Sequence, residues 1–148
     1  MALFFEDLHE VQVFESVGRT VTDHDVMTFA GISGDFNQLH TDDEFAKSSP
    51  FGSRIAHGVL VLGIATGLTQ RMGVFDGSAL ALLGLEWQFK GPVKLNDTIR
   101  LKMTIGGLRE SRTGDRGIVV RNYEILNQRN EVVQTGKITV MVRKRPKH

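Results

Sequence analysis

The hydrophobic pattern divides this chain into a helical part and a strand-rich part. Residues 57–72 are apolar on nearly every helical face, which predicts a helix surrounded by protein. Residues 98–105 alternate between apolar and polar side chains, and this period of two predicts a strand with one covered face. Three more strands are predicted at 80–89, 117–127 and 131–142, with a turn at 128–130. A helix followed by consecutive strands predicts an α+β fold, with an antiparallel meander that can curl around the helix.

The N-terminal part of the chain predicts shorter elements. Residues 10–21 indicate a strand that Gly18 interrupts. Thr22 is a good N-cap for a helix to about Ser33, because its side chain can accept a hydrogen bond from a free N–H of the first turn. The apolar stripe of this helix consists of Val26, Phe29 and Ala30. The remaining predictions are a short helix that begins at 41–44 and ends at 48–50, and strand ends or turns at Gly106, Gly107 and Gly114.

Length and composition indicate one soluble domain spanning residues 1–148. The 148 residues suffice for one hydrophobic core, and neither a repeat nor a linker is visible. The chain has no cysteine, which excludes disulfides and thiolate chemistry and fits the cytoplasm. The acidic N-terminus does not resemble a signal peptide, and the apolar run 59–68 is shorter than the ~20 residues that span a bilayer. We therefore expect a cytoplasmic protein without membrane contact.

The charge distribution argues against a nucleic-acid partner. The net charge is +1, but four basic residues lie near the C-terminus, and without them 14 basic residues stand against 17 acidic ones. The body is therefore acidic and does not present a nucleic-acid surface by charge. The four residues are Arg143, Lys144, Arg145 and Lys147. We interpret residues 143–148 as a solvated, flexible tail, with contact to the phosphates of RNA or CoA as the alternative.

The stretch 32–40 carries the first candidate chemistry. Asp35, Asn37 and His40 lie within six positions, directly after Gly34, which lets the backbone leave a helix. An Asp and a His five residues apart do not share a helical face, but they can converge on a turning loop. This arrangement gives a candidate acid/base pair. The alternative is that the Asp and the Asn only form hydrogen bonds within the turn.

A second stretch, 51–58, ends where the long apolar helix is predicted to begin. A helix start has free backbone N–H groups and the positive end of the helix dipole. Gly58 at this place leaves room for a ligand oxygen to approach its N–H. The sequence therefore predicts an oxyanion hole at Gly58.

Together the two stretches resemble the MaoC-like, or R-specific, enoyl-CoA hydratases, which have the hotdog fold. A glutamine, Gln38, stands where the signature usually has proline, which changes the loop's stiffness and no catalytic group. The resemblance extends more weakly through 87–93 and 96–97, and so covers most of the chain. The matching residues are Phe29, Ser33, Gly34, Asp35, Asn37, His40, Ala46 and 54–58.

The resemblance implies an antiparallel sheet wrapped around a long central helix, and a site at the interface of a homodimer, with larger assemblies open. It implies reversible hydration of a trans-2-enoyl thioester, carried on CoA or acyl carrier protein, to the (R)-3-hydroxyacyl thioester. Asp35 and His40 would manage one water and its proton, and the Gly58 N–H would hold the thioester oxygen. Neither a metal nor a redox cofactor is required.

Supporting roles are assigned to four further residues. Ser33 belongs to the motif, and Asn37 is interpreted as a scaffold of the loop. His57 is expected to cap or pack, with a direct chemical role as the alternative. Thr66 either steadies the catalytic loop, as a small hydroxyl residue does in the family, or bonds back to its own helix.

Two rival functions stay open at this point. A hotdog acyl-CoA thioesterase would share the fold but use one carboxylate and a water at the thioester carbonyl. A non-catalytic acyl-CoA-binding subunit would not need a paired acid and base. His9, His24 and His148 do not cluster, and their spacing gives no metal motif.

Overall fold

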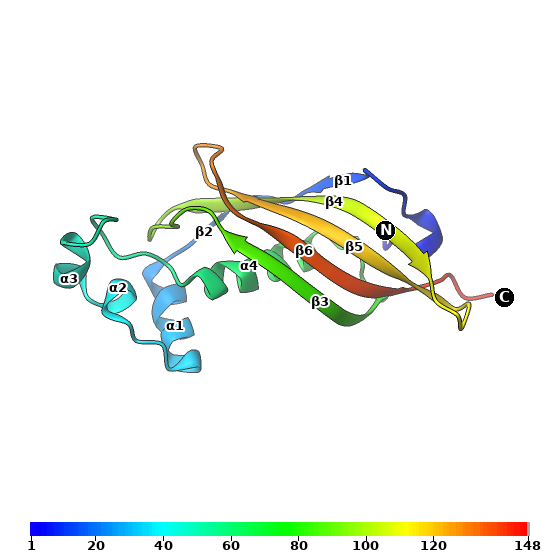
Figure 1. Cartoon of the computed structure of the whole chain (residues 1–148), viewed down its shortest axis with the longest axis horizontal. Helices are drawn as coiled ribbons and strands as arrows, with labels where there is room; N and C mark the ends of the chain where they lie inside the picture. The colour runs from blue at the N-terminus through cyan, green and yellow to red at the C-terminus, as the bar shows by residue number, and fades with distance from the viewer. Residues whose placement is uncertain (148) are drawn as a thin grey trace.

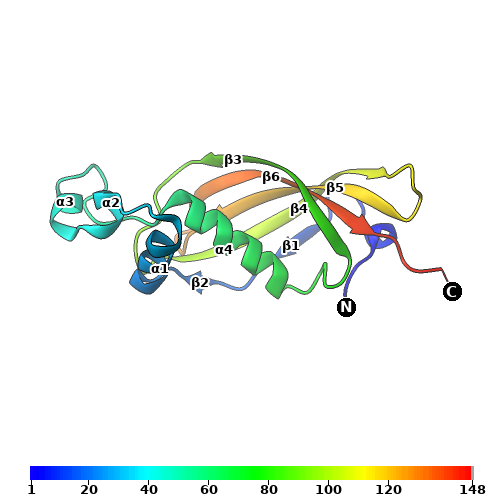
Figure 2. The same cartoon turned by 90° about the horizontal axis from the view of Figure 1, so that it is seen from below.

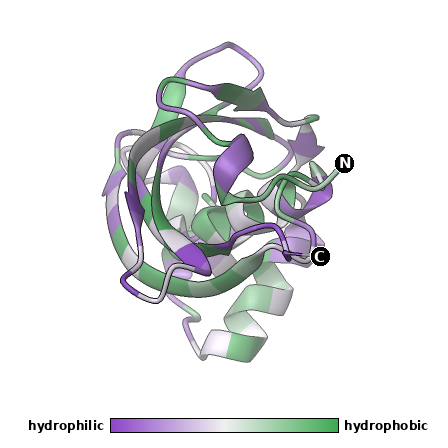
Figure 3. Cartoon of the chain, turned by 90° about the vertical axis from the view of Figure 1, so that its right-hand side faces the viewer, coloured by the Kyte–Doolittle hydropathy of each residue, from purple (hydrophilic) through white to green (hydrophobic). Residues whose placement is uncertain are grey.

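The protein is one curved antiparallel sheet that wraps around a single long helix. The computed structural model describes residues 1–147, so His148 lies outside the described part. The helix, α4 (Gly58–Arg71), lies along the concave side of the sheet (Figures 1 and 2). The four long strands are β3 (Ala79–Phe89), β4 (Thr98–Glu110), β5 (Arg116–Leu126) and β6 (Val132–Arg143). Seen from its end, the sheet forms an arc around the helix (Figure 3). This confirms the predicted α+β architecture.

The order of the strands differs in one respect from a simple meander. β4, β5 and β6 are neighbours in sequence and in the sheet, as predicted. β3 does not pair with β4; it pairs with β6, with Phe89 opposite Gln134, and forms the sheet's edge. The prediction of consecutive pairing was wrong for β3, because a period of two fixes which face of a strand is covered but not which strand lies beside it. The segment 90–97 crosses the end of the sheet to reach β4.

The hydrophobic core lies between α4 and the concave face of β4, β5 and β6. From α4, Val61, Ala65 and Leu68 are at most 1% exposed. The predicted covered face of β4 is confirmed, because Ile99, Leu101, Met103 and Ile105 are buried. From β5 and β6 the buried apolar side chains include Val119, Tyr123, Ile125, Ile138, Val140 and Val142.

One side of this unit stays uncovered in the single chain. All residues of β3 except Trp87 are exposed, among them Leu82 at 66%. The neighbouring face of α4 is exposed as well, with Val59 at 57%. The prediction that protein surrounds α4 on all sides therefore does not hold within one chain. An apolar edge strand and a helix face of small or apolar residues form one continuous uncovered side.

The N-terminal elements lie around the ends of the sheet. The 3-10 helix η1 (Phe5–Asp7) precedes the two short strands, β1 (Val13–Glu15) and β2 (Arg19–Thr20), which pair with β4. The strand predicted at 10–21 is thus broken into two, with Gly18 in the break. Three helices follow, namely α1 (Asp23–Ser33), α2 (Gln38–Thr41) and α3 (Asp43–Lys47). Figure 1 shows them gathered beyond one end of the sheet.

Two local predictions need correction. Gly106 and Gly107 lie inside β4, at an irregularity in its pairing with β5, and not at a strand end. The basic tail is not a free solvated end up to residue 145. Arg143 closes β6, Lys144 pairs with Glu110, and Arg145 forms an ion pair with Asp7 at 2.7 Å.

No helix among residues 1–147 is long and apolar enough to cross a membrane.

Replacing Gly136 by alanine should destabilise the fold. The new Cβ would overlap the backbone oxygen of Glu86 and the Trp87 ring on the neighbouring strand. Overpacking of this kind costs roughly 1–3 kcal/mol, so Gly136→Ala should melt about 2–10 °C below wild type. Gly107→Ala is the matched control, because its Cβ would meet only Val120 Cγ2 at 3.9 Å. Equal melting temperatures of the two variants, measured by circular dichroism, would contradict the β3–β6 packing described above.

Candidate functional site

The candidate loop leaves α1 through a left-handed glycine. Thr22 caps the start of α1, accepting a hydrogen bond from Asp25 N–H at 3.3 Å, as predicted. Gly34 ends the helix, and its N–H donates to Ala30 O. Its φ of 78° is a left-handed conformation that residues with a Cβ rarely adopt. The chain then turns through Asp35 into α2. The prediction of an irregular loop was wrong in one detail, because His40 lies on this single helical turn.

The ring of His40 is held by a backbone carbonyl. Its Nδ1 lies 2.7 Å from Ile55 O, and since a carbonyl can only accept, Nδ1 carries the hydrogen. In the neutral imidazole Nε2 then keeps its lone pair, ready to accept a proton. The fixed tautomer suits a general base and, once protonated, a general acid.

His57 is a buried support beneath this loop. It is 3% exposed, and its ring stacks on His40 with centroids 3.8 Å apart and packs against Phe29 at 4.8 Å. Its Nε2 donates to the backbone oxygen of Asp35 at 2.9 Å. Its Nδ1 is buried without a hydrogen-bond partner among residues 1–147. His57 thus contacts both members of the candidate pair, in line with the packing role expected for it.

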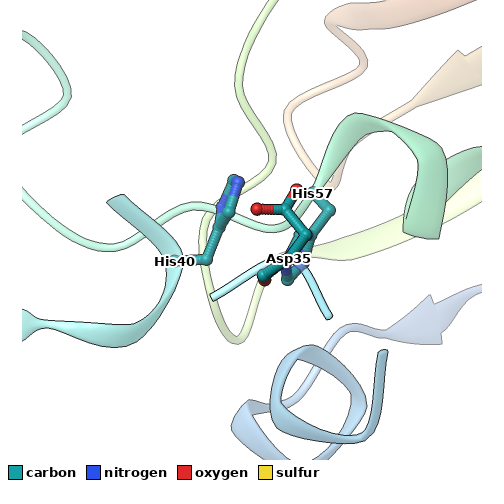
Figure 4. A group of neighbouring side chains, drawn as sticks. All are labelled: Asp35, His40 and His57. Atoms are coloured by element: carbon teal, nitrogen blue, oxygen red, sulfur yellow. The ribbon is translucent and has the colours of Figure 1, made fainter. Parts of the chain in front are cut away.

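Asp35 and His40 converge, as the loop interpretation requires. One carboxylate oxygen of Asp35 and one ring nitrogen each of His40 and His57 all lie within 4.8 Å of one another. Figure 4 shows the Asp35 carboxylate directed toward the His40 ring, with His57 beside it. Asp35 is exposed and His40 half-buried, so a water or ligand can reach both from the open side. A carboxylate and two imidazoles could also hold a cation; that none is needed stays a prediction.

Gly58 begins α4, and its N–H has no partner within the helix. Its carbonyl oxygen accepts a hydrogen bond from Gln134 Nε2 at 3.1 Å. Gln134 is 2% exposed, and its Oε1 accepts from Trp87 Nε1 at 2.8 Å. Two strands of the sheet thereby fix the peptide at the helix start. A Cβ at position 58 would lie 2.7 Å from the Phe89 ring, so packing is a second reason for a glycine at this position.

A mainly apolar cavity of about 540 Å³ opens beside Gly58. Its lining includes Ile55, the residue whose carbonyl holds His40, and Phe89 at the end of β3. Lys90 brings a positive charge to the same cavity. An apolar ligand with a polar head can therefore lie against the start of α4, although Asp35 and His40 do not themselves line this cavity.

Arg54 lies in the matching stretch 54–58, where the sequence assigned it no role, and the structure shows what it contacts. Its side chain forms ion pairs with Asp43 at 2.6 Å and Asp23 at 2.8 Å, and donates to the backbone oxygen of His40 at 3.2 Å. The hydrogen bonds that Arg54 donates to Asp23 and Asp43 raise the pKa of its guanidinium. It therefore ties the beginnings of α1 and α3 to the turn that carries His40. No local pattern predicts this contact, because Asp23 is 31 residues away.

The remaining predicted residues fall into two groups. Ser33 accepts from Asp35 N–H at 3.1 Å and Asn37 accepts from Leu39 N–H at 2.9 Å, so both lie in the hydrogen bonds of the loop. Thr66 donates to Gly63 O of its own helix at 2.7 Å. At 1.5 Å per residue it lies roughly 12 Å along α4 from Gly58, and no hydrogen bond joins it to the loop within the described chain.

Comparison with known proteins identifies relatives over most of the chain. The family model of the MaoC like domain matches residues 5–128. The (R)-specific enoyl-CoA hydratase of Rhodospirillum rubrum is 32% identical over 140 residues, covering 94% of this chain and 91% of its relative. An Archaeoglobus structure described as a monoamine oxidase regulatory protein superposes with a TM-score of 0.90 at 36% identity, covering 98% and 97% of the two chains.

The fold itself is the hotdog fold. A Mycobacterium tuberculosis protein described as having a double hotdog fold superposes with a TM-score of 0.86 at 20% identity. It covers 99% of this chain and 46% of the other, and this likeness concerns the fold alone. The match over residues 5–128, with the hydratase relative, establishes that this chain belongs to the MaoC-like dehydratase family.

Proposed function

We propose that this protein catalyses the reversible hydration of trans-2-enoyl thioesters of CoA or acyl carrier protein to (R)-3-hydroxyacyl thioesters. The observation that carries the proposal is the convergence of Asp35 and His40 on His57, the residue directly before Gly58, whose N–H has no partner within α4. The family of the chain and the hydratase named among its relatives support it.

The reaction makes three demands that these groups can meet. Water must be activated for attack at C3, a proton must reach C2, and the negative charge on the thioester oxygen must be stabilised. Asp35 and His40 share the first two tasks around one water, since both point to the same space. The Gly58 N–H, with the helix dipole behind it, serves the third. The reverse reaction uses the same groups to remove water.

We further propose that the active form is a homodimer joined through β3. The sheet ends at β3, and the uncovered side formed by β3 and the exposed face of α4 is apolar. A second copy can cover it in a symmetric way, because an edge strand related to its copy by a two-fold axis perpendicular to the sheet pairs antiparallel with itself. Such a dimer also brings its partner close to the start of α4, since β3 ends at Phe89, whose ring lies against Gly58.

One assay tests the activity. Crotonyl-CoA is mixed with the protein, and the conjugated enoyl absorbance and the free thiol are followed together. We expect absorbance to fall without thiol release. Asp35→Asn and His40→Gln should each lower turnover by roughly 10²–10⁴, with melting temperatures near wild type, because each change removes a proton-transfer group and keeps its shape. The double variant should lose little more than the worse single variant, since both groups serve one step.

Three results would count against this assignment. Thiol release would mean a thioesterase. Absence of both signals over a panel of chain lengths would favour a binding subunit. An (S)-3-hydroxy product in a chiral assay would mean that water reaches the other face of the double bond.

The glycine at position 58 should be essential for turnover and not only for packing. Gly58→Val should lower turnover by orders of magnitude in a folded protein, because the side chain blocks the approach of the thioester oxygen. The Phe89 contact offers a rival cause, so the change is repeated in a Phe89→Ala background. We expect the same loss in both backgrounds. If Gly58→Val is harmless once the Phe89 ring is gone, the glycine serves packing and the oxyanion assignment is wrong.

Light scattering at micromolar concentration should give twice the 16.5 kDa of one chain, or a multiple of that dimer. The double change Leu82→Lys and Leu85→Lys should shift the protein to monomer and abolish activity, because it places charges on the proposed interface. Val17→Lys is the control, since Val17 is an equally exposed apolar residue outside β3 and α4. A wild-type monomer that is fully active would refute the dimer.

A further inference from the structure

A second cavity of about 530 Å³ lies between the C-terminal half of α4 and the first half of β3. It shares no lining residue with the cavity beside Gly58. Much of its wall is aliphatic, with Leu80, Leu82 and Leu85 from β3. Arg121 of β5 also lines it, with its guanidinium over the rings of two further lining residues, Phe75 and Tyr123. A cavity with apolar walls and one cation is suited to a ligand that is apolar along its length and anionic at one end.

Arg121 is unusual because it is buried without an anion. Its neighbours at alternate positions on β5, Val119 and Tyr123, belong to the core, and Arg121 itself is only 8% exposed. Buried arginines are normally paired with carboxylates. Within residues 1–147 no carboxylate forms an ion pair with Arg121, and its one hydrogen bond runs from Nε to Ile138 O at 3.5 Å.

The surroundings of the guanidinium do not supply the missing charge. It lies over the rings of Phe75 and Tyr123, at 5.3 and 5.5 Å from their centroids. Burial lowers the pKa of Arg121 and raises the pKa of Tyr123, so the phenol beside it is neutral at pH 7. The phenol oxygen lies 3.0 Å from Thr69 Oγ1, and the nearby Asp76 accepts a hydrogen bond from Gln70. An arginine stays protonated in such a place, so the cavity carries an uncompensated positive charge.

We propose that this cavity binds a carboxylate at the far end of the substrate's acyl group, so that the preferred substrates are enoyl thioesters of dicarboxylic acids. The planar guanidinium offers two parallel N–H donors to a carboxylate, and the leucines cover the methylene chain. This inference rests on the proposed function and on the proposed dimer.

The dimer brings the cavity to the reacting atoms. Antiparallel pairing of β3 with its copy sets the start of one β3 beside the end of the other. The cavity runs along β3 from Ala79 to Leu85, with Arg121 level with Leu85 across Ile138, and Gly58 lies against Phe89 at the end of the strand. The acyl group of a thioester held at Gly58 therefore extends along the proposed interface toward an Arg121 cavity.

Binding of saturated thioesters tests the cavity independently of hydration, because these compounds have no double bond to hydrate. Isothermal titration compares glutaryl-CoA with valeryl-CoA and adipyl-CoA with hexanoyl-CoA, which differ only in the distal carboxylate. We expect wild type to bind at least one dicarboxylyl compound about 10–100-fold more tightly than the compound of the same length without the distal carboxylate. This is the range of a charged hydrogen-bonded contact. Arg121→Met should abolish this preference and leave the affinity for valeryl-CoA and hexanoyl-CoA within a few-fold.

Arg116→Met is the matched control, because Arg116 lies on the same strand but does not line the cavity. It forms an ion pair with Asp115 at 2.7 Å. It should keep the preference. The melting temperature of Arg121→Met should be equal to or higher than that of wild type, since the variant removes a buried, unpaired charge. Equal affinities of wild type for both members of every pair would overturn the proposal. So would an equal loss of affinity for both members in Arg121→Met, which would make Arg121 a packing residue.

Turnover provides the second readout, with trans-glutaconyl-CoA and trans-2-pentenoyl-CoA as the matched pair. Arg121→Met should lower kcat/KM by about 10–100-fold for the first and by no more than a few-fold for the second. If wild type hydrates neither compound but still binds glutaryl-CoA preferentially, the proposed function fails and the carboxylate site stands. If wild type hydrates both equally well, the function stands and the carboxylate site fails.

Discussion

The packing of α4 into the concave face of the sheet determines the place of the Gly58 peptide, around which the rest of the site is arranged. Val61, Ala65 and Leu68 bury one side of the helix among the apolar side chains of β4, β5 and β6. A helix held along its length has a fixed first turn, so Gly58 N–H has one position and one direction. Gln134 and Trp87 fix the same peptide from the sheet side by hydrogen bonds. A precise start of α4 is thus a property of the core.

The loop that carries Asp35 and His40 has little core of its own and depends on two side chains from the segment before α4. His57 is buried and holds the Asp35 backbone, while Arg54 joins α1, α2 and α3 through two carboxylates and one carbonyl. Asp35 is exposed and His40 half-buried, while His57, which orients them, is buried. This division lets the reactive side chains meet substrate while their geometry stays fixed.

The sequence allowed the prediction of those features that depend on local backbone rules. Gly34 as the end of α1, Thr22 as its cap and the start of α4 at Gly58 follow from residues close to each other in the chain. The edge position of β3 and the contacts of Arg54 and Gln134 depend on segments far apart in sequence, which no periodicity encodes. Arg121 did have a local signal. It occupies a covered-face position between Val119 and Tyr123 in an alternating strand, where a charged residue is unexpected.

The uncovered edge of β3 also has a consequence for the life of the chain before assembly. The N–H and C=O groups along a strand edge are the same for every sequence, so they accept any extended segment and do not distinguish a correct partner from an incorrect one. Discrimination is left to the side chains of β3, among which Leu82, Leu85 and Phe89 are exposed. Newly made chains therefore carry an unpaired strand edge, and the chance that they aggregate through it grows with the time they spend as single chains. In the proposed homodimer a second copy covers this edge, so rapid encounter between two copies would also protect the protein from aggregation.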